Sequence, residues 1–137
     1  MIKKDVELIK SYIKRHNWTM QQTESGLWYQ VIKEGNGMKA QNDMLVTLKY
    51  RVELLDGTLC YTSDSTGYKE VLIGAGKAES GLEEGLLFMH LGGEARFILP
   101  PHLAYGLSGD NKQIPPRSIL VYQVTFVSVA EGKDARK

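Results

Sequence analysis

The side chains that most often carry out nucleophilic or metal chemistry are few and scattered in this sequence. Its three histidines do not have the spacing of metal ligands, and its single cysteine, Cys60, has no histidine near it along the chain. A lone cysteine also excludes an internal disulfide. The sequence therefore predicts no metal site, and we interpret Cys60 as an ordinary half-buried residue of a strand.

Two other patterns are explained better by local structure than by catalysis. Glu83 and Glu84 could act as a pair of acid–base carboxylates, but a capping glutamate with a solvated neighbour explains them more simply. Gly74-Ala75-Gly76 lacks the Gly-Lys-Ser/Thr that completes a phosphate-binding loop, so we interpret it as a turn. The sequence thus predicts no cofactor.

What remains is a set of apolar and tyrosine side chains from separate parts of the chain. The set consists of Tyr50, Leu82, Tyr105, Ile114 and Tyr122. Taken singly, each is best explained as a core residue. Taken together, they could line a shallow apolar pocket with a few phenolic hydroxyl donors. Such a pocket suits a hydrophobic ligand or a peptide and does not suit the transfer of polar groups.

Composition limits the classes to which the protein can belong. Its 137 residues predict one domain. A net charge of +1 argues against a protein that binds nucleic acid through its overall charge, so no nucleic-acid partner is predicted. No apolar run approaches the roughly 20 residues that cross a bilayer, and no apolar signal segment follows the charged N-terminus. We therefore expect either a cytoplasmic protein or one whose leader has been removed.

The elements that would position these side chains begin after an N-terminal extension, residues 1–40. Apolar residues recur at helical spacing from Val6 to Ile13 and predict an amphipathic helix over residues 5–16, with Asp5 as its N-cap. A helix of this length is marginal by itself, so we expect it to dock on the rest of the molecule.

Alternation of apolar and polar residues predicts most of a sheet. The clearest segment runs from Met44 to Leu54, and Asp56-Gly57 then forms a hairpin turn. A polar loop is expected at 63–67. The last strand is apolar on both faces, so we expect it in the middle of the sheet. The predicted strands lie within residues 17–35 and at 44–54, 58–63, 69–73, 94–99 and 118–129.

A short helix and a long loop are predicted beside the sheet. Ser80-Gly-Leu-Glu83 has the pattern of a capping box, which predicts a helix that continues to His90. The loop at 100–117 holds all four prolines, and loops of this length in compact domains are usually functional. A charged tail is expected at 131–137. Together these elements predict an α+β domain whose antiparallel sheet curls over the helix.

Three stretches resemble the FKBP-type peptidyl-prolyl isomerases in sequence, order and spacing. The resemblance covers residues 44–129, and its most specific part is Pro100-Pro-His-Leu-Ala-Tyr-Gly106 followed by Ile114-Pro-Pro116. The other stretches are Val46-Thr-Leu-Lys-Tyr50 through Asp56-Gly57, and Gly81-Leu-Glu-Glu-Gly-Leu86.

The resemblance implies a half-barrel antiparallel sheet wrapped around the short helix, in an FKBP-like domain at residues 41–130. It also implies an enzyme that isomerises X-Pro bonds in proline-containing polypeptide clients. The catalytic donors would be the hydroxyl of Tyr105 and the backbone N–H of Glu79. The substrate-binding residues would be Tyr50, Tyr61, Leu82, Ile114 and Tyr122.

Several positions depart from the family pattern. Leu82 takes the place of the tryptophan at the floor of the pocket, and Ala78 is smaller than the usual residue. Cys60 and Tyr61 replace a phenylalanine and an aspartate. The pocket would be wider and less aromatic, which predicts weak activity. The alternative is a largely non-catalytic module that binds peptides, as a chaperone, on the same fold.

A further resemblance concerns location. Tyr61-Thr-Ser63 and the insertion Gly109-Asp-Asn-Lys112 resemble a subgroup of bacterial extracytoplasmic lipoproteins that carry a similar N-terminal extension. This implies a periplasmic protein or a membrane-anchored lipoprotein whose leader has been removed, with a cytoplasmic protein as the alternative. The sequence carries no signal of oligomeric state.

Overall fold

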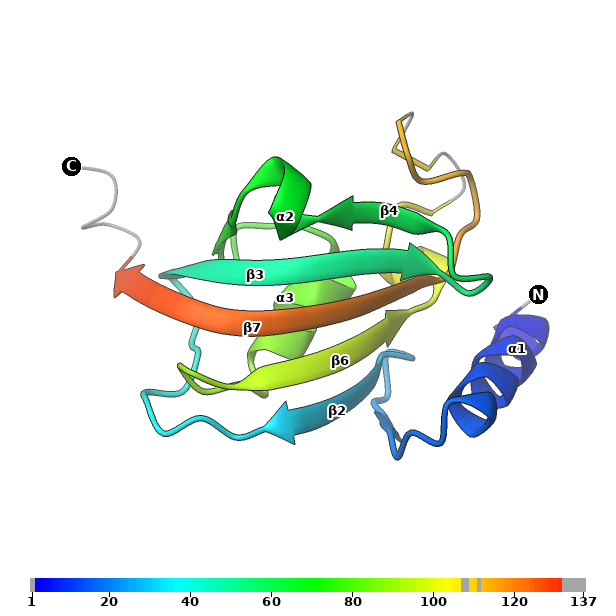
Figure 1. Cartoon of the computed structure of the whole chain (residues 1–137), viewed down its shortest axis with the longest axis horizontal. Coiled ribbons are helices and arrows are strands. Elements are labelled where there is room, and N and C mark those ends of the chain that lie inside the picture. The colour runs from blue at the N-terminus through cyan, green and yellow to red at the C-terminus, as the bar shows by residue number, and fades with distance from the viewer. Residues whose placement is uncertain (1, 107–108, 111, 132–137) are drawn as a thin grey trace.

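The structure, a computed structural model, describes residues 2–106, 109–110 and 112–131. An antiparallel sheet runs across the front of the short helix α3, and α1 lies at one end of the sheet (Figure 1). This arrangement confirms the predicted α+β class. The strands are β1 (Gln21–Gln22), β2 (Trp28–Lys33), β3 (Met44–Leu54), β4 (Leu59–Thr62), β5 (Lys69–Leu72), β6 (Glu94–Leu99) and β7 (Leu120–Glu131). The helices are α1 (Ile2–Arg15), α2 (Ser63–Thr66) and α3 (Ser80–Leu86), with a 3₁₀ turn, η1 (Pro101–Leu103).

β7 lies in the middle of the sheet, as its apolar sequence predicts. The strand order is β1-β2-β6-β7-β3-β4, and β5 also pairs with β3. β7 pairs with the whole of β3, from Met44 opposite Glu131 to Leu54 opposite Leu120. Val127, on the second face of β7, is 40% exposed, which shows that this face is covered only in part.

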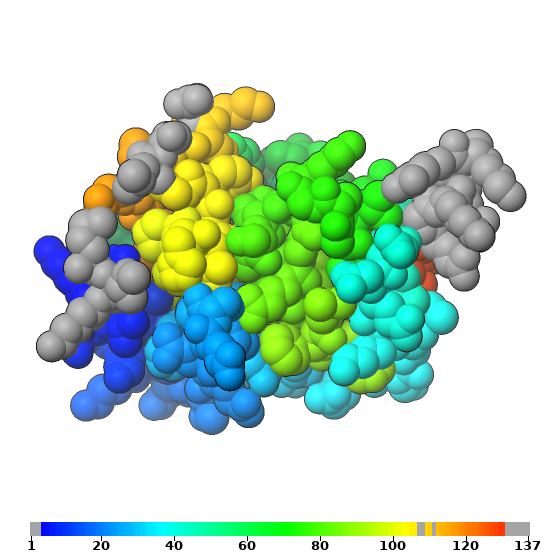
Figure 2. Space-filling view, turned by 180° about the vertical axis from the view of Figure 1, so that it is seen from behind, coloured from blue at the N-terminus to red at the C-terminus, as the bar shows by residue number. Residues whose placement is uncertain are grey.

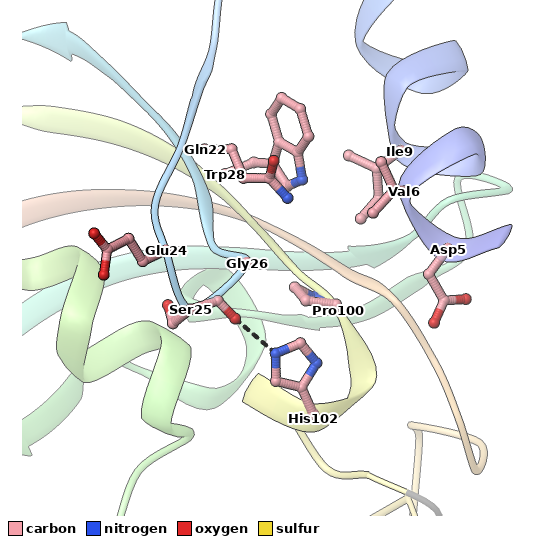
Figure 3. Close-up of a pocket in the computed structure, with 10 residues that line it drawn as sticks. All are labelled: Asp5, Val6, Ile9, Gln22, Glu24, Ser25, Gly26, Trp28, Pro100 and His102. Atoms are coloured by element: carbon pink, nitrogen blue, oxygen red, sulfur yellow. Dashed lines mark hydrogen bonds between the residues drawn. The ribbon is translucent and has the colours of Figure 1, made fainter. Parts of the chain in front are cut away.

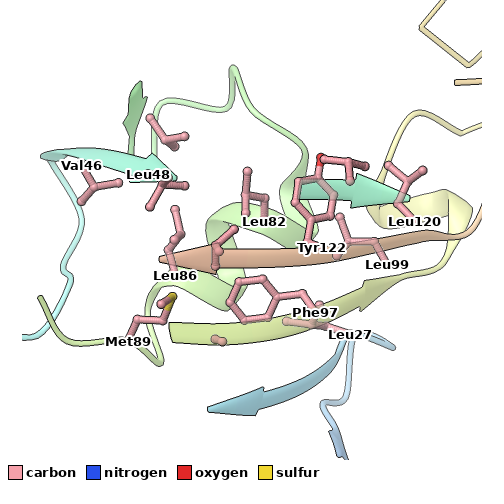
Figure 4. Close-up of a cluster of buried hydrophobic side chains, with 14 of the residues drawn as sticks. Leu27, Val46, Leu48, Leu82, Leu86, Met89, Phe97, Leu99, Leu120 and Tyr122 are labelled. Atoms are coloured by element: carbon pink, nitrogen blue, oxygen red, sulfur yellow. The ribbon is translucent and has the colours of Figure 1, made fainter. Parts of the chain in front are cut away.

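The main core lies between the sheet and α3 (Figure 4). Alternate residues of a strand point to opposite faces, so Phe97 of β6 and Tyr122 of β7 both point toward Leu82 and Leu86 of α3. All four side chains are buried. A Cβ atom on Gly85 would lie 2.7 Å from the ring of Phe97, so glycine lets α3 lie close to the sheet.

The predicted N-terminal helix docks on the opposite face of the sheet, where it forms a second core. Ile9 of α1 packs there with Ile98 of β6 and Val121 of β7. The helix begins at Ile2 and not at residue 5. Asp5 therefore lies in the first turn and is not the N-cap, although its charge still favours the positive end of the helix dipole.

The capping box predicted at the start of α3 is wrong. The N-cap is Glu79, one residue before Ser80, and it has no side-chain cap hydrogen bond. The carboxylate of Glu83 instead accepts hydrogen bonds from the backbone N–H groups of Gly74 and Ala78, at 2.8 and 3.2 Å. Because both carboxylate oxygens bind the preceding loop, Glu83 anchors that loop and does not cap the helix.

Two further boundaries differ from the prediction. α3 ends at Leu86, short of His90, because the N–H groups that follow donate to carbonyls only three residues back, which tightens the chain into turns. The polar loop expected at 63–67 contains α2, a single helical turn. Thr62 caps this turn by accepting a hydrogen bond from the N–H of Asp64.

The C-terminal end of the chain is described only as far as Glu131, which ends β7. The rest of the predicted charged tail, residues 132–137, lies outside the described residues. In the part of the chain that the structure describes, no helix is both long and apolar enough to cross a membrane.

Candidate functional site

The long loop that follows β6 holds Tyr105 near α3. Seen from behind, the segment that carries η1 lies beside the α3 region (Figure 2). Gly106 has a φ of +62°, a left-handed conformation that favours glycine. Its N–H donates to the Pro101 carbonyl at 2.9 Å, and its carbonyl accepts from the N–H of Arg117 at 2.8 Å. These bonds tie the two ends of the loop together, and the half-buried Tyr105 packs against the main core.

Glu79 offers a backbone donor at the start of α3. Its carbonyl accepts from the N–H of Glu83 at 3.1 Å, whereas its own N–H has no partner among the described residues. The bonds from Gly74 and Ala78 to the Glu83 carboxylate fix the loop that leads to this N–H. A fixed and unpaired N–H can donate to a carbonyl of a bound peptide.

The environment of Tyr105 keeps its hydroxyl protonated. Burial raises the pKa of Tyr105, and the negative charge of Glu79 and a hydrogen bond between the two side chains add to the shift. The hydroxyl can therefore serve as a donor throughout the physiological pH range. Together with the Glu79 N–H, it forms a pair of donors beside apolar surface.

Tyr61 of β4 is held by Asp110 of the long loop. Its hydroxyl donates a hydrogen bond to one oxygen of the Asp110 carboxylate, and the other oxygen accepts from the N–H groups of Lys112 and Ile114, at 2.9 and 2.8 Å. Burial alone would raise the pKa of Asp110, but the bonds from Tyr61 and the backbone lower it overall. Burial and the bond to Asp110 raise the pKa of Tyr61. The resemblance predicts an aspartate at the position of Tyr61, and the long loop brings the Asp110 carboxylate next to this position.

Three of the predicted substrate-binding residues lie in the main core. Leu82, Ile114 and Tyr122 are 0%, 3% and 2% exposed, and the three half-buried tyrosines of the prediction pack against the same cluster. The structure thus brings the predicted residues into one region, while their contacts with a substrate stay a prediction. Because Leu82, Ile114 and Tyr122 expose almost no surface, they shape the site from beneath, and the half-buried tyrosines provide its surface.

Tyr50 is tied to α2. Its hydroxyl shares a hydrogen bond with Thr66 Oγ1 at 2.6 Å, and its backbone N–H donates to Ser63 Oγ at 3.2 Å. The ammonium group of Lys69 lies 5.8 Å from the centroid of its ring. Tyr50 therefore offers an aromatic surface and not a free hydroxyl.

Asp110 is a residue of this region that sequence reasoning missed. A local signal existed, because an aspartate in a short polar insertion can accept from N–H groups two and four residues further on. The bond to Tyr61 had no such signal, since it joins residues 49 positions apart.

Cys60 agrees with its interpretation as a strand residue. It lies in β4 and is buried, and its Sγ lies 3.7 Å from the carbonyl oxygen of Gln113. Burial raises the pKa of the thiol. The group is therefore a thiol, and not a reactive thiolate, at neutral pH.

A hollow of about 270 Å³ lies apart from this region, between α1 and the segment that leads into β2 (Figure 3). Its lining includes Val6 and Ile9 of α1, Trp28 of β2, and His102 of η1. A ring nitrogen of His102 bonds the carbonyl of Ser25 at 2.7 Å. None of the predicted site residues lines this hollow.

Comparison with known proteins identifies the family. A family model described as FKBP-type peptidyl-prolyl cis-trans isomerase matches residues 36–127. The chain belongs to this family. FK506-binding protein 2 of Yarrowia lipolytica is an FKBP relative that is 32% identical over 110 residues, which cover 80% of this chain and 76% of that protein.

Bacterial FKBP relatives are longer than this chain. The probable FKBP-type peptidyl-prolyl cis-trans isomerase FkpA of Neisseria meningitidis is 34% identical over 113 residues, which cover 82% of this chain and 41% of the relative. For FkpA of Aeromonas hydrophila, the match is 33% identical and covers 98% of this chain and 50% of the relative. The chain thus spans half or less of the length of these FkpA proteins.

Solved structures confirm the FKBP fold. The crystal structure of FkpA from Escherichia coli matches with a TM-score of 0.81 and 28% identity, over 96% of this chain and 63% of that one. The crystal structure of AtFKBP13 matches with a TM-score of 0.76 and 27% identity, over 82% of this chain and 99% of that one. The match to FkpA covers nearly the whole chain and so includes most of the N-terminal extension.

Proposed function

We propose that this chain catalyses cis–trans isomerisation of the peptide bonds that precede proline in polypeptides, and thereby assists protein folding. The observation that carries the proposal is the protonated Tyr105 hydroxyl, held against the main core near the unpaired N–H of Glu79. Membership of the FKBP family supports the same function.

Rotation about a prolyl bond requires no nucleophile. It must break amide resonance, with a barrier of about 18–20 kcal/mol, and takes roughly tens to hundreds of seconds without a catalyst. A site that binds the twisted amide more tightly than either planar form lowers this barrier. A difference of about 4 kcal/mol would accelerate rotation roughly a thousandfold.

In this proposal, the donors and the apolar surface have separate tasks. The Tyr105 hydroxyl and the Glu79 N–H donate to carbonyl oxygens of the peptide on either side of the rotating bond. The proline ring rests on the surface above Leu82, Ile114 and Tyr122. Donors fixed in place before binding favour the twisted amide without the cost of reorganising water.

A protease-free isomerisation assay on an Ala-Leu-Pro-Phe peptide tests the proposal. The parent should accelerate isomerisation, and Tyr105→Phe should lose roughly tenfold in kcat/KM, the equivalent of one hydrogen bond to the transition state. Tyr68→Phe is the matched control, because Tyr68 is exposed. A folded parent that leaves the rate unchanged would contradict the proposal.

A second candidate function is a peptide-binding chaperone with little catalysis. It is favoured by Leu82, which replaces the family's tryptophan and exposes none of its surface, so that the site has no aromatic floor. In that case the double variant Leu82→Trp, Tyr61→Asp should gain isomerase activity that the parent lacks. A parent that already works at full rate excludes this candidate.

We also propose a division of the chain and a location. Residues 41–130 would form the FKBP-like domain and residues 1–40 an extension, whose β2 pairs with β6. The resemblance to extracytoplasmic lipoproteins supports a periplasmic or membrane-anchored protein with its leader removed. A relative from Arabidopsis thaliana is named a photosynthetic NDH subunit of lumenal location 4. Cell fractionation of the tagged protein would separate this location from the cytoplasmic alternative.

A further inference from the structure

The turn between β1 and β2, residues 23–26, contacts both η1 and α3. The carbonyl oxygen of Ser25 accepts a hydrogen bond from Nε2 of His102 in η1, at 2.7 Å (Figure 3). Because a carbonyl oxygen can only accept, Nε2 carries the proton of this bond. The hydroxyl of Ser25 donates to Oε1 of Glu84 in α3, at 2.6 Å. One residue of the N-terminal extension therefore bridges η1 and α3.

Local hydrogen bonds fix the conformation of this turn. The N–H of Thr23 donates to the carbonyl of Leu27 at 2.8 Å, and the N–H of Gly26 donates to the carbonyl of Thr23 at 3.1 Å. The hydroxyls of Thr23 and Ser25 share a further bond at 2.8 Å. A Cβ atom on Gly26 would lie 3.3 Å from the ring of His102, so the turn packs directly on η1. The turn is thus a fixed support for η1 and not a loose connection between strands.

The relative position of η1 and α3 sets the separation of the two proposed donors. Tyr105 follows η1 by two residues, and Glu79 is the N-cap of α3. A Cβ atom on Gly81, in the first turn of α3, would lie 3.0 Å from Cβ of Leu103, so η1 packs on the end of α3 that begins at Glu79. A hydrogen bond between the Tyr105 and Glu79 side chains also joins the two segments. A shift of η1 along α3 would therefore move the Tyr105 hydroxyl relative to the Glu79 N–H.

We propose that Ser25 and His102 are positioning residues of the isomerase site, and that the turn at 23–26 supports η1 against α3. The inference rests on the proposed function, because the donors that the turn positions are those of the isomerase. The family model begins at residue 36, so it leaves out this turn. Well-placed donors stabilise the twisted amide more than either planar form. A small displacement of η1 should therefore lower kcat and leave KM nearly unchanged.

The first test removes the hydrogen-bond donor of His102 and then restores it. His102→Phe keeps a ring beside the turn without an N–H, and should lower kcat roughly fivefold, with KM within about twofold of the parent. His102→Gln places an N–H donor at a similar distance from the backbone and should recover most of kcat. The protease-free assay on the same peptide, over a range of peptide concentrations, gives both constants for the intact chain.

His16→Phe is the matched control. His16 is also exposed, and its Nδ1 bonds the carbonyl of Tyr12 at 2.9 Å, but it lies directly after α1 and not in η1. This variant should keep the kcat of the parent. A His102→Phe variant with the kcat of the parent, or a His102→Gln variant no better than His102→Phe, would overturn the inference. An inactive parent would instead contradict the proposed function.

Further variants separate positioning from stability. Ser25→Ala removes the bond to Glu84 and should lower kcat by a similar factor. Because either loss frees η1 from α3, the double variant Ser25→Ala, His102→Phe should lose no more than about fivefold, whereas a loss of about 25-fold would refute a support shared by both bonds. Ile9→Ala destabilises the fold more than either substitution and should keep kcat. A similar fall of kcat in Ile9→Ala would assign the effects to general destabilisation and refute the positioning role.

Discussion

Tyr105 and Tyr61 each bring a phenolic hydroxyl to the site, and the two hydroxyls have different roles. Burial, the charge of Glu79 and a hydrogen bond to the Glu79 side chain keep the Tyr105 hydroxyl protonated beside the main core. The Tyr61 hydroxyl is used internally, in the bond to Asp110. The motif around Tyr105 could be recognised in the sequence, whereas the Tyr61–Asp110 pair could not, because it depends on how a loop returns to a distant strand.

Removal of the Tyr61 hydroxyl should loosen the long loop. Tyr61→Phe is expected to lower the free energy of unfolding by about 1 kcal/mol at pH 7, since one partly exposed hydrogen bond is lost. Urea denaturation measures this difference, and Tyr68→Phe serves as the control. The stabilisation by Asp110 is present above its ordinary pKa of 3.8 and is lost as the pH falls through its lower folded pKa.

The pH dependence makes this prediction sharper. The difference in the free energy of unfolding between the parent and Tyr61→Phe should shrink as the pH falls below 3.8, because protonated Asp110 accepts hydrogen bonds more weakly than its carboxylate does. A difference that is the same at neutral and at strongly acidic pH would show that Tyr61 does not act through the Asp110 carboxylate.

At the scale of elements, the strands were predictable, whereas the capping of α3 was not. The alternation of apolar and polar residues predicts β3, because a shift by one residue would turn its apolar side chains toward solvent, and apolar residues on both faces predict the central position of β7. The Ser-x-x-Glu pattern is compatible with two arrangements, since Glu83 can bond either its own helix cap or the loop before it. Only tertiary structure selects the loop at Gly74 and Ala78.

Two substitutions distinguish these arrangements. Ser80→Ala should change the free energy of unfolding by less than about 0.5 kcal/mol, because Ser80 caps nothing and alanine favours helix. Glu83→Ala should cost about 1 kcal/mol and raise KM, because the loop that positions the Glu79 N–H loses its anchor. Urea denaturation and the peptide assay measure both. A loss of about 1 kcal/mol in Ser80→Ala would instead indicate a capping box.

At the scale of the whole molecule, the N-terminal extension is part of the fold. The family model begins at residue 36, yet α1 packs on the sheet through the second core, and β2 pairs with β6. The docking of the helix was predictable from its apolar stripe. The face that it covers was not, because such a stripe can pack on any apolar surface of suitable shape.

Truncation of a side chain in the second core should therefore affect stability and spare catalysis. Ile9→Ala is expected to lower the free energy of unfolding by about 2–4 kcal/mol, because it leaves a cavity under α1. Leu8→Ala, at an exposed position of the same helix, should change it by less than about 0.5 kcal/mol. The activity of folded Ile9→Ala should match the parent, since the candidate site lies on the other face of the sheet. Equal effects of the two substitutions in urea denaturation would mean that α1 is not docked in solution.

The central claim is that the donors around Tyr105 accelerate prolyl rotation in a folding polypeptide. The most direct test is the refolding of a protein whose slow phase is limited by a prolyl bond, with catalytic amounts of the parent or of Tyr105→Phe. The account predicts that the parent shortens the slow phase and that Tyr105→Phe shortens it markedly less. A folded parent that leaves the slow phase unchanged, or a Tyr105→Phe variant as effective as the parent, would contradict it.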